Sequence, residues 1–203
     1  MKRKLAIALL SLICSCSAYG GTIVGSKHDM SHNGWGTTEN CKFCHTPHNA
    51  KAVANAPLWN GPISVVTYTL YSSPYFKGER TQTQPNTASK LCLGCHDGTV
   101  AVDSYSGSVG SHFMTDTNTI GGQGRLTSDH PISFDYDAAL ARENKTLVAP
   151  ENAKFVDANR TIPLYGGKME CASCHEPHDP EMGYFLRVNN SLGSALCFKC
   201  HLK

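Results

Sequence analysis

Hydrophobic residues in this chain fall into short runs, and long amphipathic periods are scarce. Residues 63–71, ISVVTYTLY, are β-branched and aromatic and predict a strand, which either covers an internal face or offers an edge to another subunit. Residues 136–144, YDAALAREN, predict a short helix after Asp135. Residues 103–128 are rich in Gly, Ser and Thr and predict a long surface loop. The pattern favours a mostly irregular, loop-rich fold with short helices and few strands.

The N-terminus holds the longest apolar run of the chain. Three basic residues at 2–4 precede apolar residues 5–14, and small residues follow. The run is too short to span a membrane and predicts a signal peptide over 1–20, cleaved before Gly21. A lipid anchor on Cys16 is the alternative. A signal peptide predicts a secreted protein, in the extracellular space or at the cell surface, with the periplasm as the alternative location.

Charge and composition exclude two classes of partner. Cleavage would remove three of the 18 basic residues and none of the 16 acidic ones, so the net charge would change from +2 to −1. This balance gives no basic surface for nucleic acid. No other stretch is long and apolar enough to predict a transmembrane span. A chain this polar has difficulty building a large core from its own side chains, which predicts another source of apolar surface.

Eight cysteines beyond the signal peptide form four Cys-x-x-Cys pairs, and a histidine follows each pair directly. The four motifs are Cys41/Cys44 with His45, Cys92/Cys95 with His96, Cys171/Cys174 with His175, and Cys197/Cys200 with His201. CxxCH is the attachment signature of c-type haem, in which two thiols form thioethers and the histidine binds iron. Zinc ribbons, disulfides or a thioredoxin-like motif would explain the cysteines, but none of them requires the histidines. The sequence therefore predicts four covalent haems, with the chain wrapped around their stack.

The first and third motifs extend to CxxCHxPH and end at His48 and His178. The proline disfavours helical geometry at the residue before it, and the haem plane separates the first histidine from the far face. We therefore expect His48 and His178 each to reach a different iron from that of its own motif.

The chain also repeats internally. Each half contains a free histidine, then CxxCHxPH, then Ser-x-Leu-CxxCH, and the free histidines are His28 and His130. The simplest pairing is His28 with His45, His48 with His96, His130 with His175, and His178 with His201. Donation of a ligand to a neighbouring subunit is the alternative. The predicted division is a first dihaem half over 21–110, a loop over 111–128 and a second dihaem half over 129–203, sharing one haem array.

Several other residues could bind iron in principle. His32 and His112 lie outside the repeat, and we predict that neither is a ligand. Histidine supply is sufficient, so the four methionines beyond the signal peptide are expected to pack: Met30, Met114, Met169 and Met182. Two histidines on every iron leave no open position, which favours an electron-transfer protein over an enzyme.

Several segments resemble multihaem c-type cytochromes with the doubled CxxCH motif: CHTPHNA, APLWN, SKLCLGCHDGTVAV, SDHPISFDYD and CASCHEPHD with LCFKCH. The likeness extends over nearly the whole chain after residue 20. More narrowly, the chain resembles the OmcE-type tetrahaem cytochromes of metal-reducing bacteria. This resemblance implies bis-histidine ligation and polymerisation into extracellular filaments, in which a histidine of one subunit binds a haem iron of the next. In the related six-haem filament protein it belongs to the first CxxCHxxH, a position that corresponds here to His48.

The combined expectation is electron transport through four bis-histidine haems, in a subunit of an extracellular conductive filament. The expected partners are further copies of the chain, other multihaem cytochromes as donors, and extracellular acceptors such as metal oxides. The alternatives are a soluble periplasmic tetrahaem shuttle and a multihaem reductase with an open iron. The CxxCH motifs are specific for haem, whereas nothing in the sequence is equally specific for polymerisation.

Overall fold

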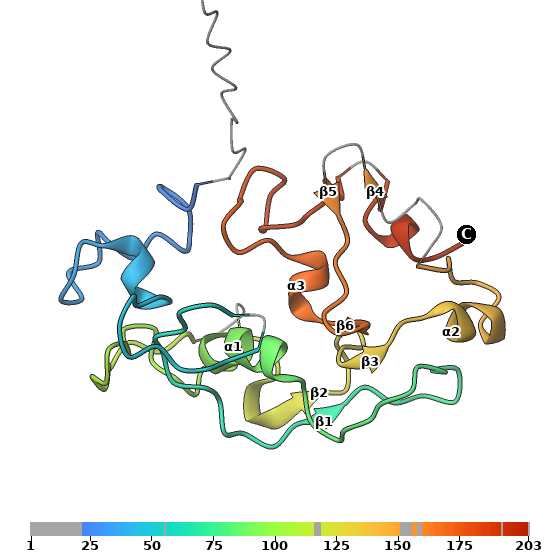
Figure 1. Cartoon of the computed structure of the whole chain (residues 1–203), viewed down its shortest axis with the longest axis horizontal. Coiled ribbons are helices and arrows are strands. Elements are labelled where there is room, and N and C mark those ends of the chain that lie inside the picture. The colour runs from blue at the N-terminus through green and yellow to red at the C-terminus, as the bar shows by residue number, and fades with distance from the viewer. Residues whose placement is uncertain are drawn as a thin grey trace, which may run out of the picture.

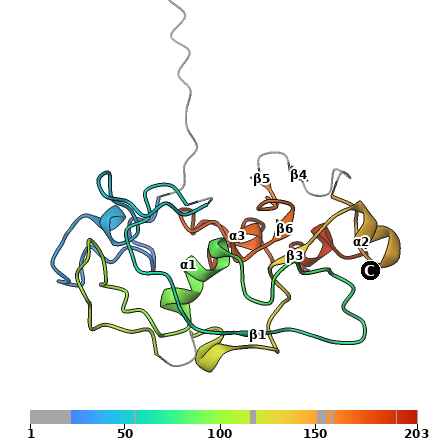
Figure 2. The same ribbon diagram turned by 60° about the horizontal axis from the view of Figure 1, so that its bottom comes forward.

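The four CxxCH segments follow one another along the long axis of the computed structural model (Figure 1). A second view, turned by 60°, places them in the same order (Figure 2). The structure describes residues 22–54, 56–115, 119–150, 156–157, 160–191 and 193–202, so the predicted signal peptide lies outside the described residues.

Regular helices are short, as predicted. They are η1 (Asn40–Phe43), α1 (Thr87–His96), η3 (Gly122–Gly124), α2 (Ala138–Glu143), α3 (Cys171–Cys174) and η5 (Cys197–Lys199). Every CxxCH segment overlaps one of them. Helix α2 lies within the helix predicted at 136–144 and confirms it, but it begins after Asp137 and not after Asp135. The Asp137 side chain caps it by accepting a hydrogen bond from the Leu140 N–H at 2.8 Å.

Strands in the described residues are two residues long. Strand β1 (Thr69–Leu70) pairs in parallel with β2 (Arg125–Leu126), while two antiparallel pairs are formed by β3 (Phe134–Asp135) with β6 (Lys168–Met169) and by β4 (Val156–Asp157) with β5 (Arg160–Thr161). The loop predicted over 103–128 therefore contains η3 and β2.

The strand predicted over 63–71 is wrong except at 69–70. The Gln84 side-chain amide takes the place of a partner strand beside this segment: its Oε1 accepts from the Tyr68 N–H at 2.8 Å, and its Nε2 donates to the Tyr68 carbonyl at 3.1 Å. The Tyr68 backbone is satisfied by one side chain, so its β-propensity does not produce a longer ladder.

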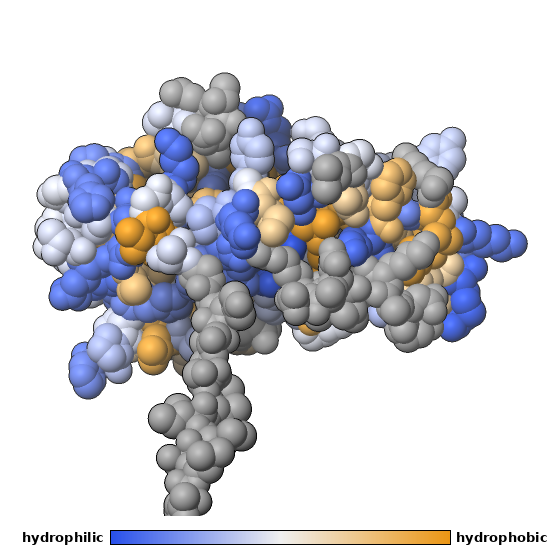
Figure 3. All heavy atoms as spheres, turned by 90° about the horizontal axis from the view of Figure 1, so that it is seen from above, coloured by the Kyte–Doolittle hydropathy of each residue, from blue (hydrophilic) through white to orange (hydrophobic). Residues whose placement is uncertain are grey.

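The buried core is small, which confirms that the chain's own side chains build little apolar interior. A larger cluster lies in the second half and consists of Phe134, Tyr136, Leu140, Val148, Ile162, Met169 and Val188. A smaller cluster consists of Tyr68, Leu93 and Leu126. Apolar side chains also remain on the surface, where Val65 is 96% exposed and Tyr184 is 91% exposed. Figure 3 shows apolar surface in separate patches along one face.

A buried carboxylate connects α1 to α3. Glu170 is 1% exposed, and its Oε2 accepts hydrogen bonds from the hydroxyls of Ser89, at 2.5 Å, and Ser133, at 2.9 Å. The Ser89 hydroxyl also accepts from the Cys171 N–H at 3.1 Å. This polar cluster joins the second CxxCH segment to the third. The division into two dihaem halves remains a prediction.

Candidate haem-binding sites

Each CxxCH segment forms one tight turn that brings its histidine next to its cysteines. In three of them the histidine N–H donates to the carbonyl of the first cysteine: His45 to Cys41 at 2.8 Å, His175 to Cys171 at 3.0 Å, and His201 to Cys197 at 2.9 Å. The remaining segment, the second motif, lies at the C-terminal end of α1. All eight described cysteines are free thiols. The described residues contain no group of three or more Cys, His or acidic side chains arranged to hold a metal ion.

The histidine rings are oriented by their Nδ1 atoms. Backbone carbonyls face Nδ1 in four of them: Pro57 for His45 at 3.0 Å, Tyr184 for His175 at 3.0 Å, Pro177 for His28 at 3.1 Å, and Pro131 for His130 at 2.9 Å. A carbonyl oxygen only accepts hydrogen bonds, so Nδ1 carries the proton and Nε2 keeps its lone pair. Metal-binding histidines commonly show this arrangement, which fixes the ring and leaves Nε2 for the metal.

Three pairs of histidine rings lie at the spacing of two ligands on one metal. An imidazole nitrogen binds a metal ion at about 2 Å and lies about 1 Å from its ring centre, so two opposed ligands have ring centres about 6 Å apart. The observed separations are 6.2 Å for His28 and His96, 5.9 Å for His45 and His178, and 6.4 Å for His130 and His201. Each pair joins one CxxCH histidine to one free histidine. Together with the free thiols and the Nδ1 donors, this spacing fits covalently attached haem c.

These ring pairs differ from the pairing that sequence order suggests. His28 lies opposite His96 and not His45, His178 lies opposite His45 and not His201, and His130 lies opposite His201 and not His175. The predicted pairing is therefore corrected for these three free histidines. The cause is tertiary: the extended third motif packs back against the first one, so His178 points to an earlier motif.

His48 and His175 are the two predicted iron ligands that do not belong to any of these three ring pairs. Each is exposed, and neither faces another histidine ring among the described residues, which include all ten histidines of the chain. The Nδ1 of His175 is nevertheless held by the Tyr184 carbonyl, as at the other sites. The predicted partnership of His48 with His96 is not formed, since His28 takes the place opposite His96.

A return segment follows each extended motif, and the sequence does not show it. Residues 57–60 pair with the first motif, and residues 184–187 pair with the third. The equivalent backbone bonds run from the N–H of Asn60 to Cys44 O at 2.9 Å, and from the N–H of Arg187 to Cys174 O at 2.8 Å. The two segments share no residue pattern, and their common feature is conformational: Leu58 and Phe185, at equivalent positions, have φ values of 59° and 56°.

The side chains of Asn60 and Arg187 are equivalent as well. Each donates to the carbonyl of the first residue between the two cysteines of its motif: Asn60 Nδ2 to Lys42 O at 2.6 Å, and Arg187 Nε to Ala172 O at 2.8 Å. The carbonyls that hold the Nδ1 atoms of His45 and His175 lie on these same return segments. The return segment thus fixes the orientation of the histidine that would bind iron.

The thiols of consecutive motifs are neighbours. Burial, the nearby Cys44 thiol and Asp97 together raise the pKa of Cys95 to about 12, and burial is the largest of these causes. A hydrogen bond with the Cys171 thiol raises the pKa of Cys92. Burial raises the pKa of Cys174 to about 11, with a further contribution from Cys200. The first motif is therefore next to the second, the second to the third, and the third to the fourth.

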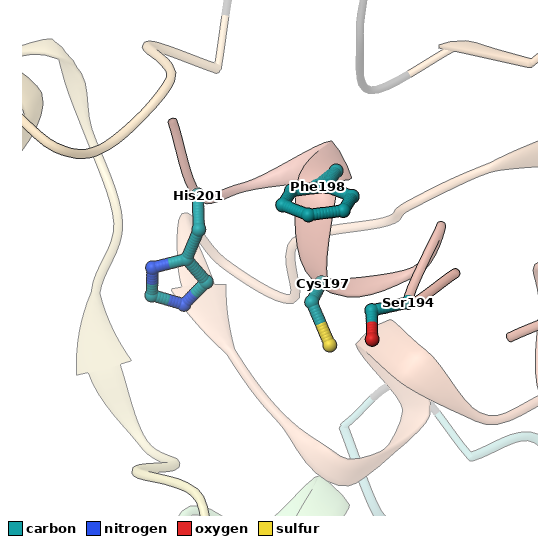
Figure 4. A pocket seen from close by; sticks show the side chains of 4 residues that line it. All are labelled: Ser194, Cys197, Phe198 and His201. Atoms are coloured by element: carbon teal, nitrogen blue, oxygen red, sulfur yellow. The ribbon is translucent and has the colours of Figure 1, made fainter. Parts of the chain in front are cut away.

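The fourth motif opens onto a cavity of about 310 Å³, lined by Ser194, Cys197, Phe198 and His201. The His201 ring and the Cys197 thiol point into this same cavity (Figure 4). A water molecule occupies about 30 Å³, so the cavity has room for a much larger group. Its lining combines one thiol, one imidazole and one aromatic face, which suits a flat apolar ring bound through a cysteine and a histidine.

The residues predicted to be non-ligands lie apart from the ring pairs. The Nδ1 of His112 is 2.8 Å from Asp103 Oδ2, and its ring stacks on Trp35 with centres 4.5 Å apart. His32 is exposed. Met169 is 3% exposed within the larger core cluster, so its predicted packing role is confirmed.

Comparison with known proteins agrees with this chemistry. Residues 163–203, which contain the third and fourth motifs, match the family model described as "Doubled CXXCH motif". No curated protein matches the chain. The match supports a multihaem c-type cytochrome, in which CxxCH segments bind haem c and its iron covalently for electron transfer. Among the described residues, no helix has the length and apolar character needed to cross a membrane.

Proposed function

We propose that this protein transfers electrons through four haem c groups attached at its CxxCH segments. The observation that carries the proposal is the set of three histidine pairs with ring centres 5.9–6.4 Å apart. Bound haem iron supplies one-electron chemistry. The protein supplies the thiols that attach each ring, the histidines that would hold the iron, and the carbonyls that keep each Nε2 facing it.

The order of the motifs supports a single path for electrons. Thiols of consecutive motifs are neighbours, and the four segments follow the long axis in sequence order (Figures 1 and 2). Haems attached there would form a chain from the first motif to the fourth. Two opposed histidines at three sites leave no position for a substrate, which favours an electron carrier over an enzyme.

The internal repeat supports assembly of copies head to tail. His28 reaches the second motif and His130 reaches the fourth, so the same relation holds in both halves. His178, at the end of the third motif, reaches back to the first. His178 therefore faces the motif two positions before its own. For His48, at the end of the first motif, the motif two positions earlier would be the third motif of a preceding copy. His175 of the third motif is the site without a second histidine.

We therefore infer a secreted filament in which His48 of one copy completes the His175 site of its neighbour. Haems would then continue across the subunit boundary and carry electrons from other multihaem cytochromes to extracellular acceptors such as metal oxides. Electron cryo-microscopy of the secreted protein, prepared without detergent, tests this. We expect filaments with haem density continuous between copies, His48→Ala to give single copies, and His32→Ala, a matched exposed histidine, to leave filaments intact. Single copies of the unaltered protein would leave a periplasmic shuttle as the function.

A reductase is the second candidate, and the His175 site favours it. In an isolated copy this site has one histidine, so a haem attached at Cys171 and Cys174 would have an open position on its iron. Nitrite or hydroxylamine would then shift a high-spin signal in isolated copies. The same shift in assembled material would favour the reductase, and its absence there would favour the electron carrier.

A further inference from the structure

The two CxxCHxPH segments differ at the residue between histidine and proline. The first contains Thr46 and the third contains Glu176. The Thr46 hydroxyl donates to the carbonyl of His48 at 2.9 Å and stays on the backbone. Glu176 instead reaches the ring of His178, with its Oε1 3.1 Å from Nδ1. Of the two histidines that end the extended motifs, the one with a partner ring in its own chain, His178, therefore faces a carboxylate.

Glu176 is held in place from its other side. Arg187 Nη1 lies 2.9 Å from Glu176 Oε2, and Arg187 Nε donates to the Ala172 carbonyl at 2.8 Å. The Arg187 side chain is 16% exposed and the Glu176 side chain is 29% exposed, so the pair is sheltered from solvent. The guanidinium keeps the carboxylate ionised, and the second carboxylate oxygen faces His178.

We propose that Glu176 lowers the reduction potential of the haem held between His45 and His178, which rests on the haem-based function proposed above. The ionised carboxylate accepts a hydrogen bond from the Nδ1–H of His178 and so increases the electron density on its Nε2. A more basic ligand stabilises ferric iron relative to ferrous iron, and the potential falls. Glu176 acts through His178 and is a positioning and tuning residue.

The other sites provide the internal reference. The Nδ1 atoms of four histidines face neutral backbone carbonyls at 2.9–3.1 Å: His28, His45, His130 and His175. Their distances match that of His178 to Glu176, so the difference lies in the charge of the acceptor and not in geometry. Charged acceptors form hydrogen bonds roughly twice as strong as neutral ones. Replacing the carboxylate by an amide of equal size would make the His178 site resemble the others.

The test is a spectroelectrochemical titration of the haem-loaded protein, comparing unaltered protein with Glu176→Gln. We expect the equilibrium constant for reduction of one of the four haems to increase about tenfold. For a one-electron step this raises the reduction potential by about 59 mV. The ferric electron paramagnetic resonance signal of that haem should shift as well. Glu39→Gln is the matched control, because Glu39 lies two residues before Cys41 and, in the part of the chain that the structure describes, its side chain makes no cap hydrogen bond at η1.

The outcomes separate the two proposals. Protein without covalent haem would end the proposed function. Haem-loaded Glu176→Gln protein whose titration superimposes on that of the unaltered protein would overturn the role of Glu176 and leave the function standing. Conversion of one haem to high spin would overturn tuning in favour of a purely positional role. A shift of equal size in Glu39→Gln would assign the effect to net charge.

Discussion

The first and third CxxCH segments, residues 41–48 and 171–178, share a motif and a local fold but differ in what their last histidine does. Both form a short helical turn, both are paired with a return segment, and both hold their first histidine by Nδ1. His178 faces His45 within the chain, whereas His48 faces outward. The local motif therefore determines where haem would be attached, and the tertiary arrangement determines which iron each second histidine would face.

The largest expected effect is on the spin state of the haem at the first motif. His178→Ala should convert one of four haems to a high-spin form in isolated copies, because His178 is opposite His45 there. His48→Ala should leave the isolated-copy spectrum unchanged, because its target lies in another copy. Absorption and electron paramagnetic resonance spectra at matched haem content measure this. Equal spectral changes in both variants would show that His48 also binds within its own chain.

The return segments should show the next largest effect. Asn60 is 7% exposed and donates to the Lys42 carbonyl, and its Oδ1 accepts from the Ser106 N–H at 2.9 Å. Asn60→Ala removes the partner of these two part-buried backbone groups and should lower the free energy of unfolding by about 1–3 kcal/mol. Arg187→Ala should have a similar effect, since Arg187 occupies the equivalent position. Guanidinium denaturation followed by tryptophan fluorescence and circular dichroism measures both.

Equal losses would support the equivalence of the two return segments. A matched control is Asn189→Ala, because among the described residues the Asn189 side chain accepts its hydrogen bonds from the nearby exposed Ser191. A loss in Asn60→Ala no greater than in this control would contradict the importance of the return segment.

How far the sequence predicts this protein depends on whether a feature is local. The CxxCH motifs, the short helices at them, the sparse core and helix α2 were all predictable, because a few consecutive residues determine each one. The strand at 63–71 was not, because β-propensity says nothing about the Gln84 amide that replaces a partner strand. The same limit applies to the candidate sites: composition shows enough histidines, but His45 and His178 meet only through the fold.

The return segments show that limit most clearly. Residues 57–60 and 184–187 both pair with an extended motif and hold the Nδ1 of its first histidine. Their side chains are unrelated, so a sequence comparison within the chain would not align them. Glu176 is intermediate: its difference from Thr46 is visible in the sequence, but only the 3.1 Å approach to His178 gives it a role.

The residue before each extended motif predicts a difference in pH dependence. Asn40 precedes Cys41, whereas the buried Glu170 precedes Cys171. Burial raises the pKa of Glu170 above its ordinary value of 4.5, despite hydrogen bonds from Ser89 and Ser133 that lower it. The folded state therefore holds this proton more tightly than the unfolded state. Stability is lost as pH rises from 4.5 through the folded pKa, and none of this loss occurs below 4.5.

Glu170→Gln should remove this loss, because glutamine has no proton to release. We expect its stability relative to unaltered protein to be greater at pH 7 than at pH 4, measured by denaturation at both values. Asn40→Ala provides the comparison in the first half and should give the same difference from unaltered protein at the two pH values. A Glu170→Gln variant with no change between pH 4 and pH 7 would show that the carboxylate does not titrate differently in the folded state.

The smallest expected effect concerns His112, which has a carboxylate partner but faces no second histidine ring among the described residues. Burial alone would raise the pKa of Asp103, but hydrogen bonds from the His112 side chain and from the His112 and Ser111 N–H groups lower it to about 2. The ionised carboxylate therefore contributes stability above pH 3.8, and this contribution is lost as pH falls through about 2. Because His112 is half exposed, His112→Ala should cost at most about 1 kcal/mol and should raise the pKa of Asp103. Haem spectra should not change. A change in spin state would show that His112 is an iron ligand. It would also show that a histidine held by a carboxylate can bind iron without facing a second histidine ring.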